Sequence, residues 1–390
     1  MPLADIAESW LAAHYDDLVA WRRHLHRHPE LGRQEFATTQ FVADRLVEAG
    51  LNPKSLPGGT GLTCDFGPEH APRIALRADM DALPMTEHTG APYSSTVPGV
   101  SHACGHDAHT AMALAAAIAL ASVPELPVGV RMLFQPAEEL MPGGALDAIS
   151  AGALSGVSRI FALHCDPRLA VGRVAITAGP ITSAADSLEI TLHSPGGHTS
   201  RPHLTSDLVY GMGTVITGLP GVLSRRLDPR HDTVMVWGAA NAGVAANAIP
   251  QNGTLAGTVR TASRGAWLGM EALVREIVSG LLAPLGIEHS LAYHRGVPPV
   301  VNEERSTQIM THAIEAVGPE VLADTRQSGG GEDFSWYLED VPGAMARLGV
   351  WDGIGPQLDL HQPNFDIDER ALAIGVRVLV NTVEAACEFC

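Results

Sequence analysis

Residues 128–139 read VGVRMLFQPAEE, an apolar run from Val128 to Phe134 that leads into two adjacent carboxylates. A short apolar run bounded by turn residues is typical of a strand that is buried on both faces. Similar runs occupy residues 74–76 and 160–163. An alanine-rich helical stretch, 110–121, lies between the runs 74–76 and 128–134. This alternation predicts an α/β domain with a doubly wound, mostly parallel sheet.

The pattern changes near residue 184. Residues 186–193 alternate apolar and polar side chains, as a half-buried strand does. A predicted helix (207–226), two strands (233–238 and 254–260), a second helix (265–282) and a strand (287–293) follow. The order βαββαβ is the ferredoxin-like plan. We therefore expect an inserted α+β domain at 184–293 within a discontinuous domain of residues 1–183 and 294–390. The spacing of apolar residues also predicts helices over the first 50 residues, with an interruption at Pro29, and over 368–386.

Composition limits the partners of the chain. Its 390 residues carry 25 Lys+Arg against 43 Asp+Glu, a formal charge of −18. Such acidity argues against nucleic acid and against an anionic membrane surface as partners. The N-terminus lacks the basic and apolar regions of a signal peptide, and the apolar stretch 111–121 is shorter than the ~18 residues of a membrane span. We expect a cytoplasmic protein without a disulfide framework, since its five cysteines are few and odd in number. We interpret Cys387 and Cys390, a lone CxxC, as a helix end.

The strongest chemical signal is CGHDAH at 104–109. Thiolate and imidazole are good ligands for zinc and similar divalent metals, and the helix that follows favours an ionised Cys104. A helix cap with a buried thiol is the alternative for this motif alone. Polar clusters also follow the predicted strands: RADMDALP at 77–84, QPAEE at 135–139, and His164. Open α/β sheets bind ligands at the carboxyl ends of their strands. One of Glu138 and Glu139 could then bind metal while the other acts as a base.

Two later segments are ambiguous when read from the residues alone. His361 lies in LHQPNF at 360–365, where neighbouring Gln and Asn side chains are equally available. The run GGGEDF at 329–334 is typical of a tight turn with an acidic helix cap.

Taken together, these motifs resemble the aminoacylase/carboxypeptidase family of two-metal amidohydrolases, in particular the branch with hippurate hydrolases and indole-acetyl-amino-acid hydrolases. The resemblance spans residues 23–368 and rests on motifs in the order of the family: RHLH and PELG at 23–32, RADMDALP, HACGHDAHT, QPAEE, His164, GGH at 196–198, NAIP at 247–250, GTVR at 257–260, GGGEDF and LHQPNFDID. Relatives often carry Ser at the position of Gly331.

The resemblance implies a role for each matching residue. Two divalent ions, zinc or manganese with cobalt also possible, would be bound by five ligands, with Cys104 as the bridge: Cys104, His106, Glu139, His164 and His361. Glu138 would be the general base for a hydroxide that bridges the ions, and Asp79 would orient an imidazole from behind the ligands.

The inserted domain is implied to act as a lid and a dimerisation domain in a homodimer or higher homo-oligomer. His198, from its own or the partner subunit, would stabilise the oxyanion, and Asn247 and Arg260 would hold the substrate carboxylate.

The reaction implied is cleavage of N-acyl-L-amino acids to a carboxylate and a free amino acid. A di- or carboxypeptidase or a carbamoyl-amide hydrolase on the same scaffold is the alternative within enzymes. A catalytically silent metal-binding scaffold protein is the alternative outside them.

Overall fold

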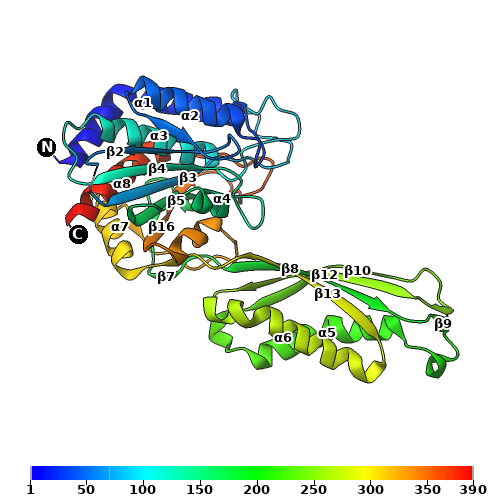
Figure 1. Ribbon diagram of the computed structural model, residues 1–390. Helices are drawn as coiled ribbons and strands as arrows, with labels where there is room; N and C mark the ends of the chain where they lie inside the picture. Colours follow the sequence, from blue (N-terminus) through cyan, green and yellow to red (C-terminus); the bar gives the residue numbers. More distant parts are fainter. Residues whose placement is uncertain (1, 70, 389–390) are drawn as a thin grey trace. The chain divides into compact units, whose positions relative to one another are not determined.

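The chain divides into two compact units (Figure 1). The computed structural model describes residues 2–69 and 71–388. The larger unit comprises Met1–Ile181, Val301–Arg326 and Asp333–Cys390, and the inserted unit comprises Thr182–Val300 and Gln327–Glu332. The inserted unit is thus wider than the range 184–293 expected from the strand pattern, because it includes the connecting segments and part of the glycine-rich turn.

The larger unit is built on a mostly parallel sheet. In spatial order its strands are β1 (Pro53–Ser55), β2 (Leu62–Phe66), β4 (Gly129–Gln135), β3 (Arg73–Asp79), β5 (Val157–Ala170), β16 (Gly343–Trp351), β6 (Val174–Ala175) and β15 (Leu322–Ala323). The central strands β4, β3, β5 and β16 run parallel, and β1, β2 and the β16–β6 pair are antiparallel. The predicted α/β fold is confirmed.

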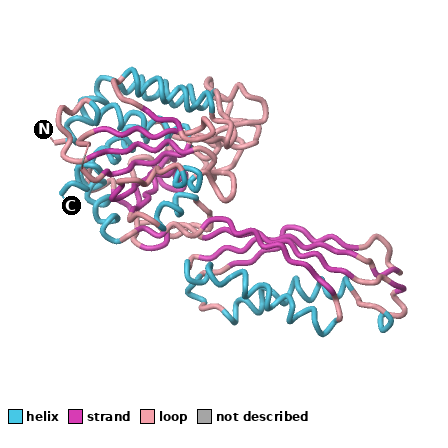
Figure 2. Tube along the Cα trace, viewed as in Figure 1, coloured by secondary structure: helices cyan, strands magenta, loops and turns pink. Residues whose placement is uncertain are grey.

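Helices cover this sheet and supply much of its core. They are α1 (Leu3–Arg27), α2 (Phe36–Glu48), α3 (His106–Ala121), α4 (Ala145–Ser150), α7 (Glu304–Val317), α8 (Arg370–Glu388) and the 3-10 helix η4 (Asp333–Glu339). The alanine-rich α3 is buried over nearly its whole length and packs against α1, α8 and β3 (Figure 2). Small side chains allow this close approach of helix and sheet.

Helix α3 begins at His106, four residues before the start expected at residue 110. The reason is Gly105, which has a left-handed φ of +89° and precedes the first helical residue. A Cβ at this position would lie 2.9 Å from Sγ of Cys165. Glycine therefore lets the chain turn sharply into the helix and places His106 and His109 in its first turn.

The inserted unit has the predicted βαββαβ order. Its elements are β8 (Ala184–His193), α5 (Leu208–Arg226), β10 (Val234–Ala242), β12 (Asn252–Thr261), α6 (Arg264–Leu282) and β13 (Glu288–Val297). The antiparallel sheet has the order β10-β12-β8-β13, and α5 and α6 pack on it (Figure 2). Asp207 and Ser263 cap these two helices by accepting hydrogen bonds from the backbone N–H of Tyr210 and Ala266.

Several short elements complete the chain. Strands β9 (Gly197–His198) and β11 (Ala248–Ile249) pair with each other, as do β7 (Gly179–Pro180) and β14 (Val301–Asn302). Three further 3-10 turns are η1 (Pro202–Leu204), η2 (Pro229–His231) and η3 (Ala283–Leu285).

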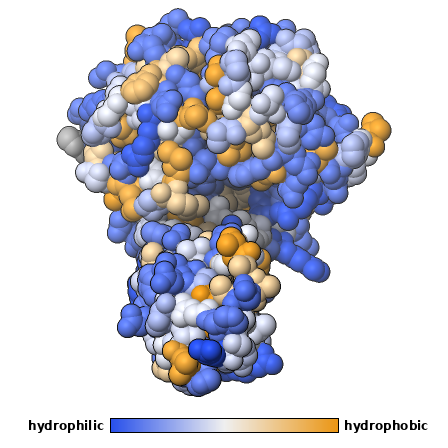
Figure 3. All heavy atoms as spheres, turned by 90° about the vertical axis from the view of Figure 1, so that its right-hand side faces the viewer, coloured by the Kyte–Doolittle hydropathy of each residue, from blue (hydrophilic) through white to orange (hydrophobic). Residues whose placement is uncertain are grey.

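In the described part of the chain, no helix combines the length and apolar character needed to cross a bilayer. Apolar side chains form small, separate patches on the face shown in Figure 3. Cys390 lies outside the described residues.

Candidate metal centre

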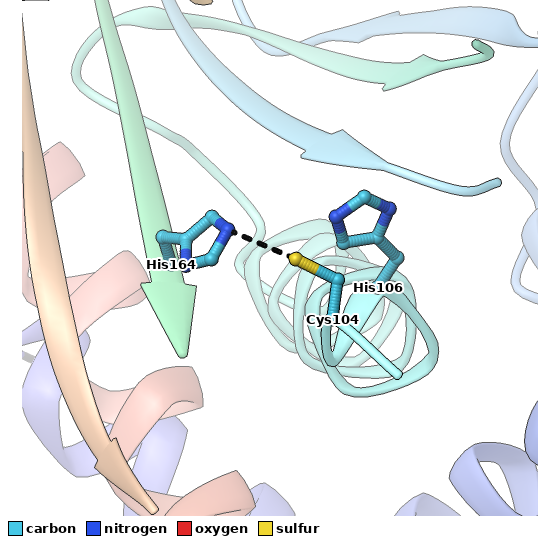
Figure 4. A group of neighbouring side chains, drawn as sticks. All are labelled: Cys104, His106 and His164. Atoms are coloured by element: carbon cyan, nitrogen blue, oxygen red, sulfur yellow. Dashed lines mark hydrogen bonds between the residues drawn. The ribbon is translucent and has the colours of Figure 1, made fainter. Parts of the chain in front are cut away.

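The predicted donor residues of the larger unit gather at one edge of its sheet. Asp79 ends β3, and Gln135 ends β4 just before Glu138 and Glu139, as expected. His164 departs from expectation, because it lies inside β5, which continues to Ala170 rather than ending before it. It nevertheless reaches the group, since its Nε2 lies 3.6 Å from Sγ of Cys104 (Figure 4).

Two histidines are fixed with the same ring nitrogen facing the group. Nδ1 of His106 lies 2.9 Å from the carbonyl oxygen of Asp81, and Nδ1 of His164 lies 2.7 Å from that of Cys165. A carbonyl only accepts, so Nδ1 must carry the hydrogen in both rings. In the neutral form of each ring, which a metal ligand must adopt, Nε2 then keeps its lone pair. Among the described residues, the buried Nε2 of His106 has no hydrogen-bond partner. This is the arrangement that metal-binding histidines use.

Cys104 is the point where two sets of donors overlap. One ligand atom from each of Cys104, His106 and His164 lies within 4.8 Å of the others, and the same holds for Cys104, Glu139 and His361. Figure 4 shows the first set, in which Cys104 and His106 come from the start of α3 and His164 from β5. A third set is His106, Glu138 and Glu139. Donor atoms of different chemistry therefore surround one small volume.

The two glutamates are placed by a strained turn. Ala137, directly before Glu138, has a φ of +57°, which a non-glycine residue rarely adopts. The turn is held by Asp81, whose two carboxylate oxygens accept the backbone N–H groups of Glu138 (3.0 Å) and Glu139 (2.9 Å). Strain of this kind persists only where the surroundings enforce it, and it is common at functional sites. Here it keeps both carboxylates at the edge of the sheet.

His361 joins the group from far along the chain. Its backbone N–H donates to the carbonyl oxygen of Ala103 over 2.8 Å, and its φ is +61°. Its Nε2 lies 3.1 Å from Oε1 of Glu139. The structure thus brings His361 to the other donors, a choice that the residues alone left open against the neighbouring Gln362 and Asn364.

Asp79 contacts a histidine that is not in the predicted ligand set. Its Oδ1 lies 2.6 Å from Nδ1 of His109, and Nε2 of His109 accepts the backbone N–H of Cys165. Its Oδ2 lies 3.8 Å from Nε2 of His106, beyond hydrogen-bond distance. Asp79 therefore fixes His109 directly and faces His106 without bonding to it.

The electrostatics of the group favour a bound cation. Burial opposes the charged form of His106, but Asp79, Asp81 and Glu139 outweigh it and raise the pKa of His106 to about 10. Burial, helped by Glu139, Glu138 and Asp79, raises the pKa of the Cys104 thiol well above its usual range. Burial and these carboxylates therefore act against the ionised Cys104 that the helix N-terminus was expected to favour.

The donor set fits a divalent metal. Burial and the neighbouring His109 lower the pKa of His164 to about 3, so this imidazole is neutral, as a ligand must be. A soft thiolate, neutral imidazoles and carboxylates are together the donors that zinc and related divalent ions select. The Cys104 thiolate needs a cation beside it, and the unpartnered Nε2 of His106 offers a coordination position.

The inserted unit holds the other predicted site residues, and they fall into two places. His198 and Asn247 are close together, because β9 pairs with β11 and the backbone N–H of Thr199 donates to the carbonyl oxygen of Asn247. Arg260 lies near the other end of β12, where Nη1 donates to the carbonyl oxygen of Gly329 over 2.7 Å. The structure therefore does not group Arg260 with the other two within this unit.

Three residues that lie near the candidate metal centre were not predicted from the sequence to belong to it. Asp81 was visible inside RADMDALP, but its role in holding the QPAEE turn depends on coordinates. Glu35 is fully buried, and its Oε1 accepts the backbone N–H of Ala137 over 2.7 Å. Asp107, next to His106, accepts Nε of Arg22 and contacts Nδ1 of His26, both at 2.7 Å. This last contact gives His26 a structural role.

Comparison with known proteins identifies the family. The model of peptidase family M20/M25/M40 matches residues 75–385. The chain belongs to this family. This match confirms, at the level of the family, the prediction of a metal-dependent hydrolase of amide bonds.

Individual relatives support the same placement. The chain is 37% identical to N-acetyl-L-cysteine deacetylase of Bacillus subtilis over 91% of its own length and 84% of that protein. It is 58% identical, over 93% of its length, to a Rhodococcus jostii protein named "Putative glutamate--cysteine ligase 2-3", but it spans only 46% of that longer protein. The crystal structure of Bacillus subtilis YXEP, described as a dinuclear metal binding peptidase from the M20 family, matches with a TM-score of 0.85 and 33% identity over 97% of this chain and 99% of that one.

Proposed function

We propose that this protein hydrolyses the amide bond of N-acyl-L-amino acids and releases a carboxylate and a free amino acid. One observation carries the proposal. Two sets of metal-ligand atoms share Cys104, and the carboxylate Glu138 lies beside the ligand Glu139. The deacetylase relative acts on a compound of the same class, an N-acyl amino acid, which supports this choice of substrate.

Two divalent ions would be held by Cys104, His106, Glu139, His164 and His361, with Cys104 shared between them. When bound, such ions act as Lewis acids and lower the pKa of a shared water. The chain also contributes the groups that hold this set in place. Asp81 fixes the backbone of both glutamates, and the carbonyl oxygens of Asp81 and Cys165 fix the rings of His106 and His164.

Glu138 is the general base in this proposal. It is buried, with 6% of its surface exposed, so its carboxylate works in a site where little bulk water competes. It takes the proton of the attacking water as the new carbon–oxygen bond forms. It then returns this proton to the amide nitrogen as the carbon–nitrogen bond breaks. We assign to His198 the role of hydrogen-bond donor to the oxyanion.

The substrate carboxylate is assigned to Arg260 and Asn247. The two ends of β12 are separated by roughly 30 Å, at the ~3.3 Å rise per residue of a strand. Arg260 lies opposite Ala185 near one end, whereas the β9–β11 pair that carries His198 and Asn247 follows the other, where Ser194 bonds to Gln251. This separation supports a homodimer in which His198 and Asn247 complete the site of the other subunit.

Two related reactions compete with this proposal. A carboxypeptidase or dipeptidase would use the same metals and base on a peptide bond, and a carbamoyl-amide hydrolase would use them on a carbamoyl group. Hippurate, N-benzoylglycine, is a specific candidate substrate. A metal-binding scaffold without activity is disfavoured, because Glu138 is present and buried beside the ligands. A cytoplasmic location also remains a prediction.

A substrate panel tests the proposal. The protein, loaded in separate samples with zinc, manganese or cobalt, is given N-acetyl and N-benzoyl amino acids, dipeptides and N-carbamoyl amino acids, and amine release is measured. The amide of each substrate's carboxyl group serves as the control for recognition by Arg260. We expect the highest kcat/KM on N-acyl amino acids and a large loss on their amides. Preference for dipeptides or carbamoyl compounds would replace the proposal with one of its alternatives, and inactivity with every metal would refute it.

A further inference from the structure

A buried arginine stands behind the metal centre and belongs to none of the roles above. Arg77 lies on β3, two residues before Asp79, so both side chains point to the same face of the sheet. Its guanidinium donates from Nη1 to Oδ2 of Asp79 (2.6 Å), from Nη2 to Oδ1 of Asp333 (2.8 Å) and from Nε to Oε1 of Gln135 (2.9 Å). The side chains of Arg77, Asp79 and Asp333 are each at most 1% exposed. Because this guanidinium is shielded from water, its hydrogen-bond partners determine its position.

Asp333 is held as firmly as Arg77. Its carboxylate accepts Nε2 of Gln135 at 2.9 and 2.7 Å and the backbone N–H of Ala145 at 3.0 Å. A Cβ on Gly143 would lie 2.1 Å from its Oδ2, so only glycine fits beside it. Asp333 is also the first residue of the larger unit after the segment Gln327–Glu332 of the inserted unit. The GGGEDF run therefore anchors the returning chain to β3 and β4 through this carboxylate.

The contact with Arg77 determines what Asp79 can do. The same oxygen, Oδ2 of Asp79, bonds to Arg77 and faces Nε2 of His106 at 3.8 Å. Ligand atoms of Asp79, His106 and His109 lie within 4.8 Å of one another, so Asp79 is close enough to compete as a ligand. Because Arg77 bonds to one oxygen and His109 to the other, both carboxylate oxygens are engaged, and Oδ2 stays 3.8 Å from Nε2 of His106.

We propose that Arg77 and Asp333 are positioning residues of the metal centre. Arg77 holds Oδ2 of Asp79, which keeps this carboxylate from competing with Nε2 of His106 for the metal. Asp333 and Gln135 hold Arg77 where it can do so. The inference rests on the proposed function only in requiring a divalent metal at His106.

The test uses Arg77→Gln and the milder Asp333→Asn, which keeps an acceptor oxygen for Gln135 and Ala145. Arg131→Gln is the control, because Arg131 forms a partly buried pair with Asp65 on the neighbouring strands β4 and β2. Each full-length variant is loaded with cobalt. Metal affinity is measured by chelator competition, coordination by the visible absorption spectrum of the cobalt, folding by circular dichroism, and kcat and KM on the best substrate of the panel.

We expect Arg77→Gln and Asp333→Asn to shift the cobalt spectrum and to weaken metal affinity or kcat about 10- to 100-fold, with KM changed much less. Arg131→Gln should lower thermal stability and leave the spectrum unchanged. The proposal is overturned if Arg77→Gln and Asp333→Asn both fold and both keep the cobalt spectrum and the metal affinity of the wild type. If Arg77→Gln does not fold, the result for Asp333→Asn decides. A wild-type protein that binds no cobalt would instead refute the proposed function, because the spectrum does not depend on any substrate.

Discussion

Oε1 of Glu139 lies 3.1 Å from Nε2 of His361, although the two residues come from opposite parts of the chain. The contact joins the turn after β4 to the loop before α8, and Cys104 completes the same donor set. The candidate metal centre is therefore assembled from the first and the last of the three segments of the larger unit. His361 reaches the other donors only where these two segments are folded together.

Replacement of Glu138 separates metal binding from catalysis. Glu138→Gln removes the proton acceptor but keeps the size of the side chain and the backbone bond to Asp81. We expect unchanged metal content and a fall in kcat of about 10²- to 10⁴-fold. Steady-state kinetics on an N-acyl amino acid, together with elemental analysis of the same sample, check this. Undiminished kcat would exclude Glu138 as the base.

Gly105 is predicted to be essential for the start of α3. In Gly105→Ala the left-handed backbone costs about 1–2 kcal/mol, and the new Cβ would lie 2.9 Å from Sγ of Cys165. We expect lower thermal stability and weaker metal binding, because Cys104 and His106 flank this residue. Gly269→Ala in α6 is the control. No neighbouring atom lies within 4 Å of its added Cβ, so stability should rise by about 0.5–1 kcal/mol. Equal effects of the two substitutions would contradict the account of the turn.

Buried Glu35 is predicted to make stability depend on pH. Burial raises its pKa to about 7, so the folded protein keeps a proton there that the unfolded chain loses near pH 4.5. The stabilisation from this proton is complete below pH 4.5 and is lost as pH rises to about 7. The free energy of unfolding should thus fall by about 3 kcal/mol across this window because of Glu35.

Urea denaturation at constant saturating metal, from pH 4.5 to 8, measures this effect. Glu35→Gln keeps the acceptor for Ala137 and should remove this part of the decline. The exposed Glu48→Gln should leave the profile unchanged. A Glu35→Gln profile that overlays the wild type would show that Glu35 does not carry the proton.

Mixed dimers can decide which subunit supplies His198. Chains with Glu138→Gln and with His198→Ala are each expected to be nearly inactive alone. If His198 acts in the other subunit, a purified heterodimer with one chain of each kind contains one complete site and should regain about half of the wild-type activity. If His198 acts in its own subunit, both sites stay defective and activity stays low. Differently tagged, co-expressed chains provide the heterodimer, and each homodimer is the control.

Much of the fold follows from the sequence, because the buried runs 74–76, 128–134 and 160–163 and the alternating strands after residue 184 have strong periodicity. Less of the local geometry does. The start of α3 depends on the conformation of Gly105, and the position of His164 depends on how far β5 extends through its pairing with β16. Neither is encoded in the period of apolar residues.

The candidate ligands were proposed from motifs, whereas most of the residues that position them were not. Cys104, His106 and Glu139 lie in short, chemically distinctive runs. The bonds of Asp81 to the QPAEE turn, of Glu35 to Ala137 and of Arg77 to Asp333 join residues that are distant in sequence and become visible only when side chains are placed. The high pKa of Cys104 likewise reflects burial and carboxylates that the fold brings to it, and neither effect is visible in its proximity to a helix start.

We propose that two metal ions share Cys104, in a centre built from the first and last segments of the larger unit. The most direct test of this proposal is the number of divalent ions per chain, measured by elemental analysis after dialysis against a weak chelator. We predict two ions per chain in the wild type and at most one in Cys104→Ala, while Cys64→Ala, which removes another buried thiol, keeps two. Two ions retained in Cys104→Ala, or none in the wild type, would contradict the account.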